Sequence, residues 1–273
     1  MCSSDLASPD GLGVTNLDRS WLASMTGGRD PDNPRHFIVQ PDVTLASKYM
    51  AHGMNIGGDE PVWQPSLALD GILPGMTLKA WMNHPLDGDL DDFVEVDYLL
   101  MLQHTFDAHS PAAINLHGYA DYWIYPFKTF ADDPGNELDG WKFHAGISLP
   151  NLVKLGRVPV VPSYNYYYWT PRESGEFDRG GIHELFLFAP IPGDLLWLRT
   201  PPAQTIDLGA SLNYHDGAFG FPSALSHATA HLSTTFNLKG ILLTPSVNYQ
   251  WSFEDEINPE DEFWAALSAS VRF

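Results

Sequence analysis

The chain has 273 residues, enough for one large β domain or two smaller ones. Lys and Arg number 14 against 34 Asp and Glu, so the formal net charge is −20. Nucleic acid is excluded as a partner, because a nucleic-acid binder needs a basic face. The single cysteine excludes a disulfide framework and a thiolate metal cluster, and no metal ion or other cofactor is expected. No run of about 18 apolar residues occurs, so no transmembrane helix is predicted.

The first 41 residues differ in character from the rest of the chain. Residues 1–6 resemble a translated sequencing adapter, so we expect the natural start, and a signal peptide with it, to lie upstream. Residues 7–41 are rich in Gly, Pro, Asp and Asn and are predicted to be loop with a short helix near residues 17–24. Residues 42–273 are predicted to form a single β-barrel.

Twelve extended segments follow from Asp42 onward, each of roughly 10–13 residues, which is the length of a tilted membrane strand. Apolar and small polar side chains alternate along them, the period of a strand with two different faces. In the sixth segment, for example, Trp141 and Phe143 oppose Lys142 and His144. The predicted spans are 42–54, 62–73, 76–84, 93–106, 112–125, 138–149, 158–169, 181–189, 204–215, 226–238, 241–253 and 262–273.

Short turns and long polar loops alternate between these segments. The turns at residues 73–75 and 238–240 are tight, whereas the loops at residues 85–91 and 254–261 are long and acidic. Outer-membrane barrels show this asymmetry between their two ends. An even number of strands also lets the first strand pair with the last, which removes both edges of the sheet.

A soluble β-sandwich or lipocalin-like barrel would alternate in the same way. Aromatic residues near the segment ends favour a membrane barrel instead, because they resemble interfacial girdles. The polar faces carry mainly Ser, Thr, Asn and Gly, whereas solvent-facing strands usually carry Lys and Glu. The outward faces almost lack charge, and a Lys or Arg at mid-membrane would cost about 2–4 kcal/mol. The sequence therefore predicts an all-β, 12-stranded antiparallel transmembrane β-barrel in the bacterial outer membrane.

The last eleven residues resemble the closing strand of bacterial outer-membrane barrels, which has a terminal Phe preceded by alternating apolar residues. Phe263, Leu267, Val271 and Phe273 share one face of this segment and are the expected assembly signal. The resemblance implies that outer-membrane lipid and the barrel-assembly machinery are partners of this chain. We expect the last strand to close the barrel against residues 42–54.

Two stretches are similar to strands of the TorF-type porins. Residues 45–54 resemble the first strand of that family, in which a Ser, an aromatic residue and a downstream Gly open the barrel. His52 stands where the family tends to have Arg before the Gly. Residues 93–98 resemble an acidic, aromatic strand of the same family. The resemblance implies an outer-membrane barrel with a transport role.

The polar face of the segments should line the lumen, and it carries both signs of charge. Acid and base inside a small barrel can pair across it and narrow the passage, so these side chains fit either a structural network or a polar path for solutes. We expect passive passage or binding of small hydrophilic solutes, with a bias toward cations. The predicted lumen-lining residues are Lys48, Lys79, Glu95, Asp97, His117, Asp121, Lys142, His144, Asp207, His231 and Arg272.

Two other functions remain open at this point. His231 and Ser233 resemble the His-x-Ser pair of outer-membrane lipid hydrolases, and they share one face of a strand. The apolar neighbours Ala230 and Leu232 claim the lipid face, so the pair is expected to point into the barrel, and no enzyme is predicted. The third alternative is a closed barrel with a structural role.

Overall fold

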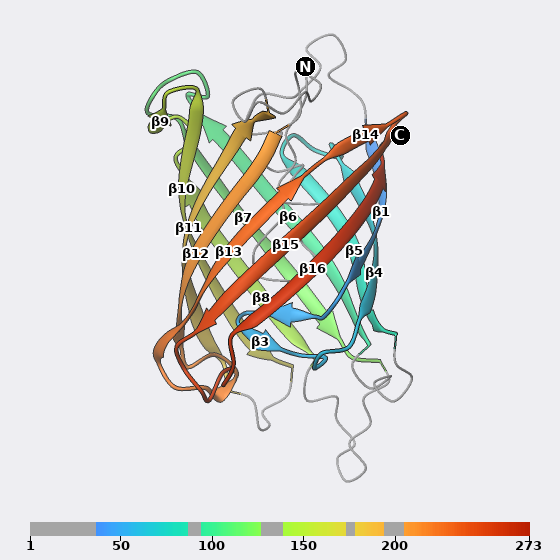
Figure 1. Cartoon of the computed structure of the whole chain (residues 1–273), viewed down its shortest axis with the longest axis vertical. Helices are drawn as coiled ribbons and strands as arrows, with labels where there is room; N and C mark the ends of the chain where they lie inside the picture. Colours follow the sequence, from blue (N-terminus) through green and yellow to red (C-terminus); the bar gives the residue numbers. More distant parts are fainter. Residues whose placement is uncertain (1–36, 87–93, 127–138, 173–177, 194–204) are drawn as a thin grey trace.

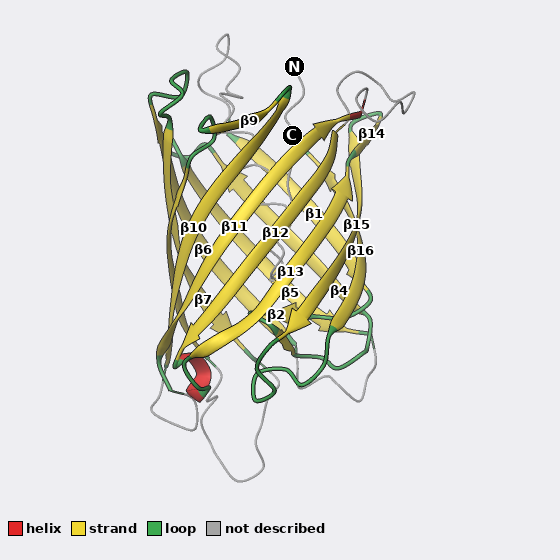
Figure 2. Cartoon of the chain, turned by 60° about the vertical axis from the view of Figure 1, so that its left-hand side comes forward, coloured by secondary structure: helices red, strands yellow, loops and turns green. Residues whose placement is uncertain are grey.

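The computed structural model describes residues 37–86, 94–126, 139–172, 178–193 and 205–273, which form a closed β-barrel (Figure 1 and Figure 2). Twelve long strands make the barrel, and β2, β3, β9 and β14 are short additions. No helix within the described ranges is long and apolar enough to cross a membrane. The strands are β1 (Ile38–Ala46), β2 (Met50–Ala51), β3 (Met54–Asn55), β4 (Val62–Asp70), β5 (Met76–Pro85), β6 (Glu95–Phe106), β7 (Ile114–Ile124), β8 (Gly140–Ser148), β9 (Val153–Leu155), β10 (Val158–Pro171), β11 (Gly180–Pro192), β12 (Thr205–Asp216), β13 (Ala224–Thr234), β14 (Phe236–Leu238), β15 (Ile241–Ser252) and β16 (Glu262–Val271).

Each barrel strand pairs antiparallel with its neighbours in the chain, and β1 pairs with β16 to close the ring. The register at this seam runs from Asp42 opposite Ser270 to Ala46 opposite Ala266. The hydroxyls of Thr44 and Ser268 bond across the seam on the inner side, at 2.7 Å. The predicted 12-stranded antiparallel barrel is therefore confirmed, and it has no free edge among its twelve long strands.

The two ends of the barrel differ. The turn between β14 and β15 and the last residue, Phe273, lie at the upper rim in Figure 1. We refer to this rim as the turn end. The connections that follow β1, β12 and β15 lie at the opposite rim, the loop end.

Strand alternation gives the wall two contrasting faces. In β16, Phe263 and Leu267 are exposed on the outer face, whereas Trp264, Ser268 and Ser270 are buried on the inner face. The same division holds around the ring, with exposed Leu, Phe, Tyr and Trp outside and Ser, Thr, Asn and charged residues inside. The apolar outer face would be poorly soluble in water but suits the hydrocarbon core of a membrane, where a side chain finds no hydrogen-bond partner.

The first strand differs from its prediction over residues 42–54. β1 begins four residues earlier, at Ile38, and ends at Ala46; residues 47–61, which we name the inserted loop, then turn into the barrel. Here β2 and β3 form a two-stranded sheet of their own, turned by His52 and Gly53 with φ of 50° and 89°. Apolar and polar residues alternate in the sequence through residue 54. The side chains of residues 47–54 nevertheless pack inside the barrel and not on its outer face.

An apolar cluster fills the barrel interior near the loop end. Tyr49 and Ala51 of the inserted loop pack there with residues of the surrounding strands. Phe219, in the 3₁₀ turn η4 (Ala218–Gly220) after β12, covers the cluster through contacts with Trp123 and Trp169. The interior of the barrel at the loop end is thus packed with apolar side chains, as the core of a soluble domain is.

Candidate functional site

The candidate site is the interior surface of the barrel. Among the residues predicted to line the lumen, eight lie buried on the inner face of their strands. His144 lies on the same face and is half-buried, as is Arg272, whose Nε donates to Gln40 Oε1 at 2.9 Å. Lys48 lies on no strand: it opens the inserted loop. The eight buried residues are Lys79, Glu95, Asp97, His117, Asp121, Lys142, Asp207 and His231.

Acidic side chains outnumber basic ones among the buried residues that the structure describes on the strands. The basic pair is Lys79 and Lys142. The seven buried carboxylates are Asp42, Glu95, Asp97, Asp121, Glu184, Asp207 and Glu262.

Lys142 and Asp121 form a buried ion pair on neighbouring strands β8 and β7. The Nζ–Oδ2 distance is 3.1 Å, and each side chain is only 1% exposed. Trp123 Nε1 donates to the same carboxylate oxygen at 2.6 Å, and the Lys142 ammonium lies 4.4 Å from the centroid of the Trp123 ring. The ion pair is therefore held by a hydrogen bond and a cation–π contact together.

A second polar network joins β7, β8, β10 and β11. Asn165 donates from Nδ2 to Glu184 Oε2 at 2.8 Å, and the Tyr167 hydroxyl donates to the same oxygen at 2.9 Å. The amide oxygen of Asn165 lies 2.9 Å from His117 Nε2 and 3.1 Å from His144 Nε2. Sequence reasoning found the two histidines but not Asn165 or Glu184, which link them to the next strand.

The inserted loop reaches across the interior from β1 to the far wall. The His52 ring lies between three aromatic rings, with centroids 6.2 Å from Trp123, 5.3 Å from Tyr167 and 6.1 Å from Phe219. Burial holds the pKa of this loop imidazole well below its ordinary value, with Lys142 adding repulsion. His52 is therefore neutral at physiological pH while it occupies this position.

Two side chains of the barrel wall bind the backbone at the tip of the loop. His215 Nε2 on β12 lies 2.9 Å from the carbonyl oxygen of His52, and Gln250 Nε2 on β15 donates to the carbonyl of Gly53 at 2.8 Å. A Cβ atom on Gly53 would overlap the ring of His227 on β13. The tip is thus fitted against β12, β13 and β15.

Polar contacts hold the base of the loop. Lys48 forms ion pairs with Asp59 in the loop and with Glu262 on β16. Burial works to lower the pKa of Lys48, but the hydrogen bonds to these two carboxylates raise it above its ordinary value. Lys48 in turn lowers the pKa of Asp59. Lys48, which was expected to line the lumen, therefore joins the inserted loop to the barrel wall.

Many inward-facing residues are buried in both halves of the barrel. Around the inserted loop Asn83, Glu95 and Trp169 have no more than 2% of their surface exposed. Toward the middle of the barrel, inward residues such as Ser246 and Phe186 are partly exposed. Asp207, Ser233 and Thr244, farther toward the turn end, are again no more than 3% exposed, so the inner face is closely packed in that half too.

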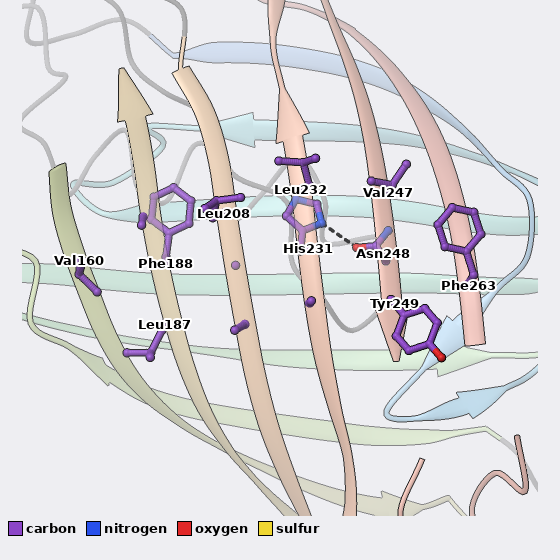
Figure 3. Close-up of a pocket in the computed structure, with 14 residues that line it drawn as sticks. Val160, Leu187, Phe188, Leu208, His231, Leu232, Val247, Asn248, Tyr249 and Phe263 are labelled. Carbon is purple, nitrogen blue, oxygen red and sulfur yellow. Dashed lines mark hydrogen bonds between the residues drawn. The ribbon is translucent and has the colours of Figure 1, made fainter. Parts of the chain in front are cut away.

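An apolar groove of about 510 Å³ lies on β11, β12, β13 and β15 (Figure 3). Ala210 and Ala230, which are opposite each other, make a low area between larger outward side chains such as Leu187 and Tyr249. His231 contributes to the lining from the inner side, where its Nδ1 lies 2.6 Å from Asn248 Oδ1. The groove offers contacts for hydrocarbon and little else.

The His231 and Ser233 pair faces the interior. Asp207 lies opposite Ser233 in the strand register, and all three side chains are buried. Ser233 Oγ is buried with no hydrogen-bond partner in the structure, so the two residues are not joined as nucleophile and base. The outer surface that a lipid substrate would reach carries Ala230 and Leu232 instead.

No protein-family model and no curated protein sequence matches this chain. Among solved structures, an outer membrane channel from Pseudomonas putida F1 superposes with a TM-score of 0.51 at 12% identity, covering 90% of this chain and all of that chain (100%). The NanC porin gives 0.48 at 8% identity over 86% of this chain and 99% of its own, and LpxR from Salmonella typhimurium gives 0.48 at 9% over 85% and 99%. The first of these superpositions shows that this chain shares its fold with an outer membrane channel.

The resemblance to TorF-type porins stays a prediction, since no family model matches. Of the two stretches that suggested it, residues 95–98 do lie in a barrel strand, β6. Residues 47–54 do not, because they belong to the inserted loop.

Proposed function

We propose that this protein resides in the bacterial outer membrane and lets small hydrophilic solutes pass, with a preference for cations. The observation that carries the proposal is the contrast between an apolar outer face and an acid-rich inner face of one closed barrel. The shared fold with an outer membrane channel supports the location and the role.

A bilayer recording tests this proposal directly. The purified barrel is inserted into a planar bilayer, and current is measured with a KCl gradient across it. We expect discrete conductance steps and a reversal potential displaced toward the K⁺ equilibrium potential. The absence of current from protein that shows a folded, heat-modifiable band on gels would support the closed structural barrel instead.

Cation preference has its own matched test. Asp97 and Glu184 are interior carboxylates outside the Lys142–Asp121 pair. The double substitution Asp97→Asn with Glu184→Gln removes two negative charges and keeps similar shapes. We expect the reversal potential to move toward zero, because the field that favours cations is weaker. An unchanged reversal potential would show that the excess of acidic side chains is not the cause of the selectivity.

The competing function is a lipid or ester hydrolase that uses His231 and Ser233. Because both side chains are buried inside the wall, we expect Ser233→Ala to leave any lipid or ester hydrolysis unchanged. A loss of hydrolysis in this variant, with folding intact, would overturn the non-enzymatic proposal.

A further inference from the structure

We propose that the inserted loop is a gate: Lys48 latches it inside the barrel, and its withdrawal opens the loop end and exposes an acidic wall to passing ions. This inference rests on the proposed channel function. It adds the element that controls the passage and the surface that appears when the passage opens.

The loop fills the loop end because it contacts most of the ring. Tyr49 bonds to Glu95 on β6, His52 packs on Trp123 of β7 and Tyr167 of β10, and its backbone is held from β12 and β15. Lys48 reaches β16 through Glu262. The loop thus contacts six strands of the ring, and its residues Tyr49 and His52 are buried among them.

The way the loop is attached permits it to leave. Its own sheet, β2 with β3, is separate from the barrel sheet, so withdrawal of residues 48–60 breaks no strand pairing of the barrel. The two ends of the loop emerge next to each other, because Ala46 lies opposite Val62 in the pairing of β1 with β4. Apart from apolar packing, the loop is held by hydrogen bonds and ion pairs, each of which water can replace.

Withdrawal changes the surface that ions meet. Glu95 and Glu184 are now covered by the loop and by the rings that it packs against, and they are no more than 2% exposed. Lys48 would leave the wall with the loop, which frees the Glu262 carboxylate. The open passage should therefore be more selective for cations than the closed one is.

A disulfide between the loop tip and the wall tests the gate. A Cβ atom built on Gly53 lies 3.1 Å from His227 Cγ, which puts the two backbones within bridging range. In a Cys2→Ser background, Gly53→Cys with His227→Cys is recorded before and after reduction by dithiothreitol. We expect the oxidised protein to stay in its low-conductance state and the reduced protein to show additional openings. The single variant His227→Cys, treated alike, should not respond to reduction.

A second variant covers the case in which the cysteines disturb folding. Residues 48–60 are replaced by Asn-Gly, a turn that suits a hairpin between paired strand ends. We expect a higher single-channel conductance and a reversal potential shifted further toward the K⁺ equilibrium potential. Lys48→Ala, which removes only the latch, should raise the fraction of time spent open.

The outcomes separate the gate from the channel. If the shortened barrel inserts and conducts as the parent does, with equal selectivity, the gate is wrong and the channel stands. If the shortened barrel inserts and passes no current, the proposed function itself fails.

Discussion

The hydroxyl of Tyr49 donates to Glu95 Oε2 at 2.9 Å, although Tyr49 follows β1 and Glu95 begins β6, three strands further round the ring. Tyr125 donates to the same oxygen at 2.7 Å. One carboxylate therefore joins the inserted loop to the wall. The two tyrosines form a matched pair, because only one of them belongs to the loop.

Tyr49→Phe should release the loop more often than Tyr125→Phe does. Each substitution removes one hydrogen bond to a charged acceptor, worth about 1.5–3 kcal/mol. In Tyr49→Phe this loss favours the open state, whereas in Tyr125→Phe it weakens the wall. Open probability in bilayer recordings measures the difference. Equal open probability in the two variants would contradict a gating role for the Tyr49 contact.

Acidification should favour release of the loop through His52. In the seated loop the pKa of His52 lies well below its ordinary value, whereas a released His52 in water has a pKa of about 6.5. Above both values His52 is neutral in both states and pH has no effect. As the pH falls below about 6.5, the released loop binds a proton that the seated loop cannot, which favours release by at most about 1.4 kcal/mol per pH unit.

The charged and titratable groups around His52 act in the same direction. Lys142 and His144 approach it from β8, His215 from β12 and His227 from β13. Open probability measured between about pH 8 and about pH 5 should rise as the pH falls. His52→Asn, which tolerates the left-handed φ at this position, should flatten that rise. His183→Phe, on the outer face of β11, is the control; a rise that is identical in all three proteins would exclude His52.

Breaking the Lys142–Asp121 pair should destabilise the barrel more than removing both charges. Lys142→Met leaves a buried carboxylate without its counter-charge, which costs about 3–5 kcal/mol. Adding Asp121→Asn should recover much of that loss, because the amide oxygen can still accept from Trp123 Nε1. Urea unfolding in lipid vesicles gives the free energy of unfolding of the parent, the single variant and the double variant. A double variant as unstable as Lys142→Met would argue against charge as the cause.

Neighbouring residues on β15 test which face meets lipid. Val247 is exposed on the outer face, and Ser246 is half-buried on the inner face. Val247→Arg places a charge in lipid and should cost about 2–4 kcal/mol near mid-membrane, which lowers the folded yield in vesicles. Ser246→Arg should fold and shift the reversal potential toward the anion side. The reverse pattern would mean that the two faces are assigned wrongly.

The sequence was sufficient to predict the strand number, the closure of the ring and the general face of most strands. Period two is set by backbone geometry, so it identifies Phe263 and Leu267 as one face wherever the strand lies. Turn residues and the even count then constrain how the strands are joined.

The inserted loop could not be predicted in the same way. Residues 47–54 alternate like a strand, and an alternating pattern does not tell lipid from an apolar cluster inside the barrel. The placement of Tyr49 depends on Glu95, which is distant in sequence and close only after the ring has closed. A local signal was present in His52 and Gly53, since a glycine within a strand pattern suggests a turn or a close approach of the backbone.

The seam between β1 and β16 has a consequence for assembly. The inserted loop leaves β1 directly beside that seam, and Lys48 contacts Glu262 on the closing strand. Once β16 has paired with β1, the wall surrounds the loop, and the loop can be seated only through the loop end, which is also the route by which it leaves when the gate opens. The pairing of Phe273 with Val39 would then close the turn-end side of the seam, away from that route.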